Sequence, residues 1–200
     1  LKNSDLFLLF LSIVLAVSAI TGVTFLGDRL RLSIKQQAAV VLAADVTLRS
    51  TAPIGPKYLS IAKGQELNTA ETISFLSMTL HGGNNVLSSI KTTTPEYPLR
   101  GKIKLLDFNG QNIDKPTGSP MSGNVWAEQS LIDRFNIGKG DSITIGNKRF
   151  VVSAILADFP DRNVGFLAFA PTVIANIEDL DAMGVIQPGS RALYRQLYSG

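Results

Sequence analysis

The sequence predicts an α+β protein in which one membrane-spanning helix precedes a domain of mixed sheet and helices. Three observations lead to this prediction: a long uncharged apolar segment near the start, many short strand-like segments, and Gly- and Pro-rich turns between them. The chain has 200 residues, 45% hydrophobic and 18% charged, which is typical of a folded protein. We expect residues 1–27 to form the transmembrane helix and residues 28–200 to form a core domain with an inserted smaller β-rich subdomain.

The composition excludes several classes of site. The chain has no Cys, which excludes disulfides, cysteine nucleophiles and thiolate metal ligands. His81 is the single histidine, so a two-histidine zinc motif is excluded and a Ser/His/Asp triad has one possible base. The net charge of +3 is too small for a dedicated nucleic-acid-binding protein. We therefore expect no metal, no cofactor and no nucleic-acid partner.

The apolar segment Leu6–Leu26 carries no charge and lies between Asp5 and Asp28. As a helix it would be about 31 Å long, which matches a hydrocarbon core of about 30 Å. A cleaved signal peptide is an alternative, because Lys2 precedes the segment and 17–19 (VSA) could be a cleavage site. Apolar residues continue well beyond that point, whereas a signal h-region has about 7–15 residues. We therefore favour a membrane helix over a signal peptide or a buried core helix.

Helical spacing continues after the apolar segment. Leu30, Ile34, Ala38, Val41 and Leu42 recur on one side of residues 28–44. The membrane helix is therefore expected to continue as an amphipathic helix that packs on the domain, with 28–42 acting as a lever. An interfacial helix on the membrane surface is the alternative.

The remaining elements are predicted from alternation, periodicity and turn residues. A hairpin is the clearest case, because the turn sequence Gly82-Gly83-Asn84-Asn85 joins two strand-like segments. Residues 109–124 are expected to be a loop, since several Gly and Pro residues interrupt them. The predicted strands are 45–50, 67–80, 86–94, 102–106, 124–127, 142–145, 149–156, 166–169 and 192–198. The predicted helices are 53–64, 128–135 and 171–181.

Candidate catalytic and binding residues each have a structural alternative. His81 is either a base or a surface turn residue, and Arg162 either an interface residue or part of a turn salt bridge. Residues 138–140 (GKG) lack the spacing of a phosphate loop, and 118–123 (GSPMSG) lack the form of a nucleophile elbow. Trp126 is typical of a core anchor rather than of a sugar platform. Five acidic residues could pair as catalytic carboxylates or form a solvated face: Asp158, Asp161, Glu178, Asp179 and Asp181. We predict no catalytic, cofactor-binding or metal-binding residue.

Residues 124–156 (NVWAEQSLIDRFNIGKGDSITIGNKRFVVSAIL) resemble a pattern in extracytoplasmic domains of MacB/FtsX-type ABC transporter permeases. In that pattern a short strand precedes a helix, a Gly-x-Gly-Asp turn, a hydrophobic strand, a Gly turn and a second strand. The turn residues Gly140 and Asp141 and the alternating Ile143, Ile145 and Phe150 fit it.

Further segments resemble the YbbP-like subgroup, which is linked to lysophospholipase L1. They occur in the same order and cover nearly the whole chain: 25–48, 71–78, 97–101 (YPLRG), 160–162 (PDR), and 187–191 (QPGSR) with Tyr194-Arg195. The resemblance implies that the chain is the first membrane span plus most of the first periplasmic domain of a multi-helix permease. Residues 28–200 would be a MacB-like periplasmic core domain, incomplete at its C-terminus.

The resemblance also implies a function of the mechanotransmission type. A non-catalytic permease subunit would couple ATP hydrolysis in a separate cytoplasmic ABC ATPase to export or extraction of a lipid-like or hydrophobic substrate. A periplasmic thioesterase/lysophospholipase is a further expected partner, and the bacterial inner membrane is the expected location. The alternatives are a membrane-anchored periplasmic hydrolase and an adaptor for a periplasmic enzyme.

Overall fold

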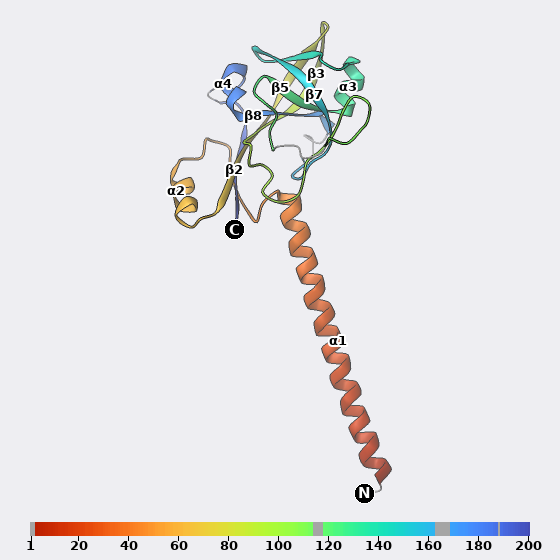
Figure 1. The fold of residues 1–200 in the computed structure, drawn as a ribbon. Coiled ribbons are helices and arrows are strands. Elements are labelled where there is room, and N and C mark those ends of the chain that lie inside the picture. The colour runs from red at the N-terminus through yellow and green to blue at the C-terminus, as the bar shows by residue number, and fades with distance from the viewer. Residues whose placement is uncertain (1–2, 114–117, 163–168, 188) are drawn as a thin grey trace. The chain divides into compact units, whose positions relative to one another are not determined.

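The computed structural model describes residues 3–113, 118–162, 169–187 and 189–200 (Figure 1). It divides into two compact units, Leu1–Ala38 and Ala39–Gly200. Helix α1, Asn3–Leu42, makes up the described part of the first unit and ends inside the second. The helix predicted for the N-terminal region and its continuation to residue 42 are thus confirmed as secondary structure.

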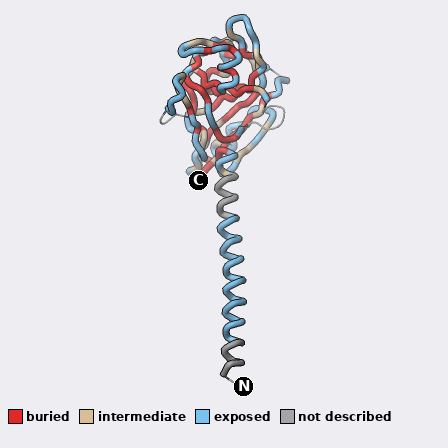
Figure 2. The backbone as a smooth tube through the Cα atoms, turned by 90° about the vertical axis from the view of Figure 1, so that its right-hand side faces the viewer, coloured by how far each residue is buried: buried red, intermediate tan, exposed pale blue. Residues whose placement is uncertain are grey.

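Within the first unit, α1 has the length and apolarity that a bilayer requires. The segment Phe10–Arg31 has 22 residues and a mean hydropathy of 2.1, and none of its most apolar stretch is buried (Figure 2). Apolar side chains such as Phe10, Ile20 and Val23 are exposed on all sides of the helix. A helix that is apolar all round is stable when its surroundings are apolar as well. The side chains of residues 3–9 and 32–38 lie outside the described part.

The second unit is built on one mixed nine-stranded sheet, which confirms the α+β class. Its order is β1-β9-β2-β3-β8-β5-β7-β4, and β6 pairs with both β2 and β7. Six strands (β2, β3, β8, β5, β7, β6) therefore close into a ring. The strands are β1 Val46–Ser50, β2 Asn68–His81, β3 Asn84–Thr93, β4 Lys104–Leu106, β5 Asn124–Glu128, β6 Ser142–Ile145, β7 Lys148–Asp158, β8 Thr172–Asn176 and β9 Leu193–Ser199.

Short helices connect the strands. They are α2 Lys57–Gly64, α3 Gln129–Phe135, the 3₁₀ turn η2 Ile177–Asp179, and α4 Leu180–Met183. The predicted helices at 53–64 and 128–135 are therefore confirmed with shorter bounds. The predicted strand at 166–169 falls almost entirely outside the described residues.

The hairpin of β2 and β3 has a tighter turn than predicted. His81 pairs with Asn84, so only Gly82 and Gly83 form the turn, with φ of 56° and 82°. Two consecutive positive φ angles match the twist of a two-residue hairpin, and glycine adopts them without strain. Asn84 and Asn85 belong to β3 instead of the turn.

The predicted helix at 171–181 is wrong. Thr172–Asn176 is strand β8, and only the residues after it form the short turns η2 and α4. All five residues of β8 are buried, because β8 lies between β3 and β5 and is covered on both faces. A strand buried on both faces lacks the alternation that identifies strands, so the accidental helical spacing of its apolar residues was misleading.

The two faces of the sheet bury two separate cores. One core fills the ring and includes Phe75, Ile90, Phe150 and Val173, with Leu131 and Phe135 of α3 packed against them. The second core covers the outer face of the same strands and contains Tyr97, Trp126, Leu156, Phe159, Ile174 and Leu197. The period-two alternation of the strands sends neighbouring residues, such as Val173 and Ile174, to different cores.

Replacing Phe150 tests this assignment of faces. Phe150→Ala should lower the free energy of unfolding of residues 39–200 by about 3–5 kcal/mol, because it leaves a cavity inside the ring. Val151 points to the other side and is 41% exposed, so Val151→Ala should cost less than about 1 kcal/mol. Urea unfolding of both variants measures the difference, and equal losses would contradict the assignment.

Candidate functional site

The loop that follows β7 connects the last turn of α1 to the buried face of the sheet. The backbone N–H of Asp161 donates to the carbonyl of Val41 at 2.9 Å, and the N–H of Arg100 donates to the carbonyl of Ala43 at 2.9 Å. A Cβ added to Gly101 would lie 3.3 Å from Val40 and from Pro160. Two loops, 97–101 and 158–162, therefore hold the residues at which α1 ends within the second unit.

Asp161 lies in a cluster of buried charges. Lys91 from β3 is fully buried, and its Nζ donates to the carboxylate of Asp161 at 3.2 Å and to its backbone carbonyl at 2.7 Å. Arg195 from β9 donates to the other carboxylate oxygen of Asp161. The backbone of Asp161 has φ of 59°, which turns the chain so that one residue contacts both cations and Val41. Asp161 thus contacts α1 through its backbone N–H and links β3 to β9 through its carboxylate.

The charges within this cluster are not balanced. Lys91 and Arg195 contribute two cations against the single carboxylate of Asp161. Burial lowers the pKa of Lys91 to about 8, although the carboxylate of Asp161 counteracts this effect. The Nε of Arg195 is buried and has no hydrogen-bond partner in the described part of the chain. The cluster therefore depends on Asp161, its only acidic member among the described residues.

The rings of Tyr97 and Phe159 lie near the buried ammonium group of Lys91. Its Nζ lies 5.6 Å from the ring centre of Tyr97 and 5.1 Å from that of Phe159, within the range of cation–π attraction. The hydroxyl of Tyr97 donates to the carbonyl of Pro160 at 2.9 Å, and burial raises the pKa of Tyr97. These contacts fix the loop that presents Asp161.

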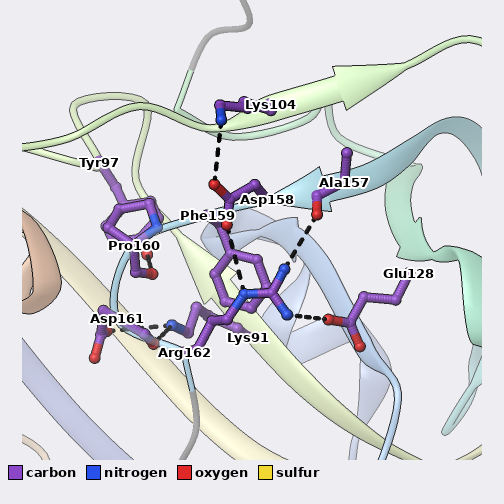
Figure 3. Close-up of polar contacts among 10 residues, drawn as sticks. All are labelled: Lys91, Tyr97, Lys104, Glu128, Ala157, Asp158, Phe159, Pro160, Asp161 and Arg162. Carbon is purple, nitrogen blue, oxygen red and sulfur yellow. Dashed lines mark hydrogen bonds and ion pairs between the residues drawn. The ribbon is translucent and has the colours of Figure 1, made fainter.

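Arg162 forms the exposed side of the same loop (Figure 3). Its guanidinium lies 3.3 Å from Glu128 and 3.6 Å from Asp158, donates to the carbonyl of Ala157, and covers the ring of Phe159 at 4.9 Å. Glu128 also accepts a 2.7 Å hydrogen bond from the N–H of Thr172, at the start of β8. This geometry corresponds to the turn salt bridge rather than to a free interface residue.

A second ion pair, between Arg100 and Asp45, lies just after the end of α1. Arg100 donates to both carboxylate oxygens of Asp45 at 2.9 and 2.7 Å, and to the carbonyl of Gly200 at 2.9 Å. The hydrogen bond from Arg100 lowers the pKa of Asp45. Arg100 therefore ties together the end of α1, the loop 97–101 and the end of β9.

The other residues singled out from the sequence have structural partners. The Nδ1 of His81 lies 2.8 Å from the carbonyl of Ser142, and its ring packs on Phe135 at 5.7 Å. Trp126 belongs to the outer core. The N–H of Gly138 donates to Asp141 at 2.8 Å, which makes the 138–141 segment a β-turn.

Three of the predicted acidic residues, Asp158, Asp161 and Asp179, are paired with cations. Asp179 is buried and accepts from Lys148 at 2.5 Å, from the hydroxyl of Ser122 at 2.5 Å and from the N–H of Gly123 at 3.0 Å. Burial opposes its ionisation, but these hydrogen bonds together lower its pKa. Glu178 and Asp181 are exposed. Among the described residues, no three acidic or histidine side chains gather as a metal ion would require.

The sequence of the whole chain matches a known domain family. Residues 6–198 match the MacB-like periplasmic core domain. The chain belongs to this family. This finding confirms the resemblance to MacB/FtsX-type permeases on which the sequence interpretation rested.

Two proteins that the chain matches are distant from it in sequence. The chain is 26% identical over 199 residues to the "Uncharacterized ABC transporter permease YbbP" of Escherichia coli (strain K12). All of this chain aligns, but only 24% of that protein, so the chain spans about a quarter of the length of this relative. Among solved structures, the periplasmic region of MacB from Actinobacillus actinomycetemcomitans aligns with a TM-score of 0.46 at 11% identity. The alignment covers 76% of this chain and 73% of that structure.

Three segments that carried the family resemblance meet at the candidate site. They are 97–101, 160–162 and the pair Tyr194-Arg195, and together they supply Tyr97, Arg100, Asp161 and Arg195. Sequence reasoning did not single out Lys91, which lies in a strand rich in Ser and Thr. The motif segments of this family member thus converge on the end of α1.

Removing the carboxylate of Asp161 tests its role in the cluster. Asp161→Asn should lower the free energy of unfolding of residues 39–200 by about 3–5 kcal/mol, because it leaves two buried cations without a counter-charge. The matched variant Asp158→Asn removes a carboxylate that is 52% exposed, and should cost about 1 kcal/mol or less. Urea denaturation measures both, and a loss for Asp161→Asn no larger than for Asp158→Asn would contradict the role of Asp161.

Proposed function

We propose that this chain is part of the permease subunit of an ABC transporter of the mechanotransmission type. In this proposal α1 crosses the bacterial inner membrane, and residues after about 27, the predicted periplasmic core domain 28–200, lie in the periplasm. The family membership, the apolar segment of α1 and the printed name of the E. coli relative support it. The observation that carries the proposal is the attachment of the end of α1 to buried charges in the sheet.

This attachment is suited to transmitting force. A displacement of the last turn of α1 would act on Asp161 through the hydrogen bond at Val41. Asp161 would pass it to β3 through Lys91 and to β9 through Arg195, because both ion pairs are shielded from water. Separating a buried ion pair costs several kcal/mol, so β3 and β9 would move together with Asp161. In this proposal residues 28–42 are the lever.

The energy source would lie in a partner, a cytoplasmic ABC ATPase subunit, and the permease subunit itself would be non-catalytic. ATP hydrolysis would drive the export or extraction of a lipid-like or hydrophobic substrate. Alternatively, it would act on a periplasmic partner such as a thioesterase/lysophospholipase. The alternative of a hydrolase with paired carboxylates is less well supported. Asp158, Asp161 and Asp179 are each bound to cations in the described structure.

Co-purification tests the proposal directly. The full-length protein, expressed in its native membrane, should bring down an ATP-binding subunit at about equal stoichiometry, because a permease subunit alone lacks an energy source. Mass spectrometry of the purified complex measures the ratio. Recovery of the chain without any such subunit would favour the anchored-enzyme or adaptor alternatives.

The lever is tested within the same complex. Ile34→Pro should abolish the coupling of ATP hydrolysis to transport, because proline breaks the helix between the membrane span and Val41. Ile34→Ala, which keeps the helix, is the matched control and should retain coupling. Assembly with the ATPase should be intact in both variants, as judged by co-purification. Full coupled activity of Ile34→Pro would exclude a lever at 28–42.

A further inference from the structure

We propose that the open edge of β2 at Phe75–Met78 binds an extended peptide segment of a protein partner by strand addition. On one side β2 pairs with β3 without interruption from Thr72 to His81. On its other side it pairs with β9 up to Ser74 and with β6 only from Thr79 onwards. No described strand pairs with β2 between these two points. The sheet therefore has a gap four residues long, about 13 Å at the usual rise per residue.

The backbone groups that point into this gap can be identified from the alternation of the strand. The carbonyl of Glu71 accepts a hydrogen bond from the N–H of Thr94 at 3.1 Å, so Glu71 directs its polar groups toward β3. Successive residues of a strand point these groups to opposite sides, so Leu76 and Met78 direct theirs into the gap. The only contact found there in the described structure is one of 3.5 Å from the hydroxyl of Ser77 to the Met78 carbonyl. Two N–H donors and at least one carbonyl are thus available to a partner.

A cavity of about 830 Å³ opens beside this edge. A smaller cavity, of about 430 Å³, lies at the tip of the β2–β3 hairpin. The larger cavity is lined by Ser74, Phe75 and Leu76 of β2 and by Val185, Ile186 and Arg191 of the segment before β9. The hydroxyl of Ser74 is buried and has no hydrogen-bond partner in the described structure. Arg191 is exposed, and no described carboxylate pairs with it. An uncompensated cation beside an open strand edge favours a peptide that carries a carboxylate, either a side chain or a C-terminus.

Apolar side chains continue along the hairpin from this edge. Leu76, Met78 and Leu80 share one face of β2, and Leu87 of β3 lies directly opposite Met78. Each is between 36% and 44% exposed, although all four are large and hydrophobic. An added strand would place alternate side chains over this row and remove it from water.

The chemistry of the gap favours a peptide over a lipid chain. Leu76 and Met78 present donors and acceptors in alternation, and only a polypeptide backbone offers the complementary alternation at the same spacing. An acyl chain would cover the apolar row but leave these polar groups without partners, which is unfavourable. The predicted ligand is therefore an extended segment of about four residues with apolar side chains on one face and a carboxylate near Arg191. This inference does not depend on the transport proposal.

A displayed library of random hexapeptides with free C-termini tests the inference on the purified full-length protein. The selected peptides should bind the wild-type protein, and their affinity should fall at least tenfold for Leu76→Pro, which removes an N–H donor that faces the gap. Proline should be tolerated at this position because that N–H makes no hydrogen bond within the described fold. Fluorescence polarisation of a labelled selected peptide measures the affinities.

A second variant tests the inference independently of whether Leu76→Pro folds correctly. Arg191→Gln should weaken the same peptide severalfold, whereas Lys139→Gln, which removes an exposed cation outside the cavity, should leave binding unchanged. Alternate N-methylation of the peptide should abolish binding, because it blocks the backbone donors. The inference is overturned if no selected peptide depends on Leu76 and Arg191, if the N-methylated peptide binds equally well, or if a fluorescent fatty acid binds the cavity and no peptide does.

Discussion

The carboxylate of Asp161 is the group on which the arrangement of the second unit depends. It lies between two buried cations, Lys91 of β3 and Arg195 of β9, while the backbone N–H of Asp161 donates to the carbonyl of Val41 at the end of α1. Without this counter-charge, the desolvation cost of burying the two cations would not be offset by an attractive interaction. Strand β9, the loop after β7 and the end of α1 are therefore coupled at a single residue, through its side chain and its backbone. Three of the segments on which the family resemblance rests contribute residues around this contact.

The fold could be predicted from the sequence where alternation or turn residues indicate a strand. The strands at 46–50 and 193–199 and the hairpin at 68–93 alternate or carry clear turn residues, and their positions were predicted to within a few residues. The strand at 172–176 was misassigned, because contacts on both faces bury every one of its residues. The closure of the ring through β6 was not predicted either. It depends on the pairing of Thr79 with Ile145, which no local sequence pattern indicates.

The candidate site could be predicted only in part. Asp161 and Arg162 attracted notice because they lie in a turn-prone acidic segment, but nothing in the sequence indicated which groups they contact. Lys91 and Arg195 are 70 and 34 residues away from Asp161 along the chain, and their burial follows from strand pairing over those distances. A lysine among serines and threonines suggests a solvated strand, because burial of a charge is visible only once its partner is in place. The resemblance to a family pointed to the right segments without indicating that they meet.

The position of β9 has a consequence for the synthesis of the protein. β9 ends at Ser199, yet it lies between β1 and β2, two of the earliest strands of the domain. In the described sheet β1 has no other partner, so residues 46–50 must wait until about 150 further residues have been made. During that interval β1 and the first half of β2 present unpaired edges, and Lys91 has one of its neighbours missing. The emerging chain is therefore expected to need protection from aggregation until β9 has been synthesised and released.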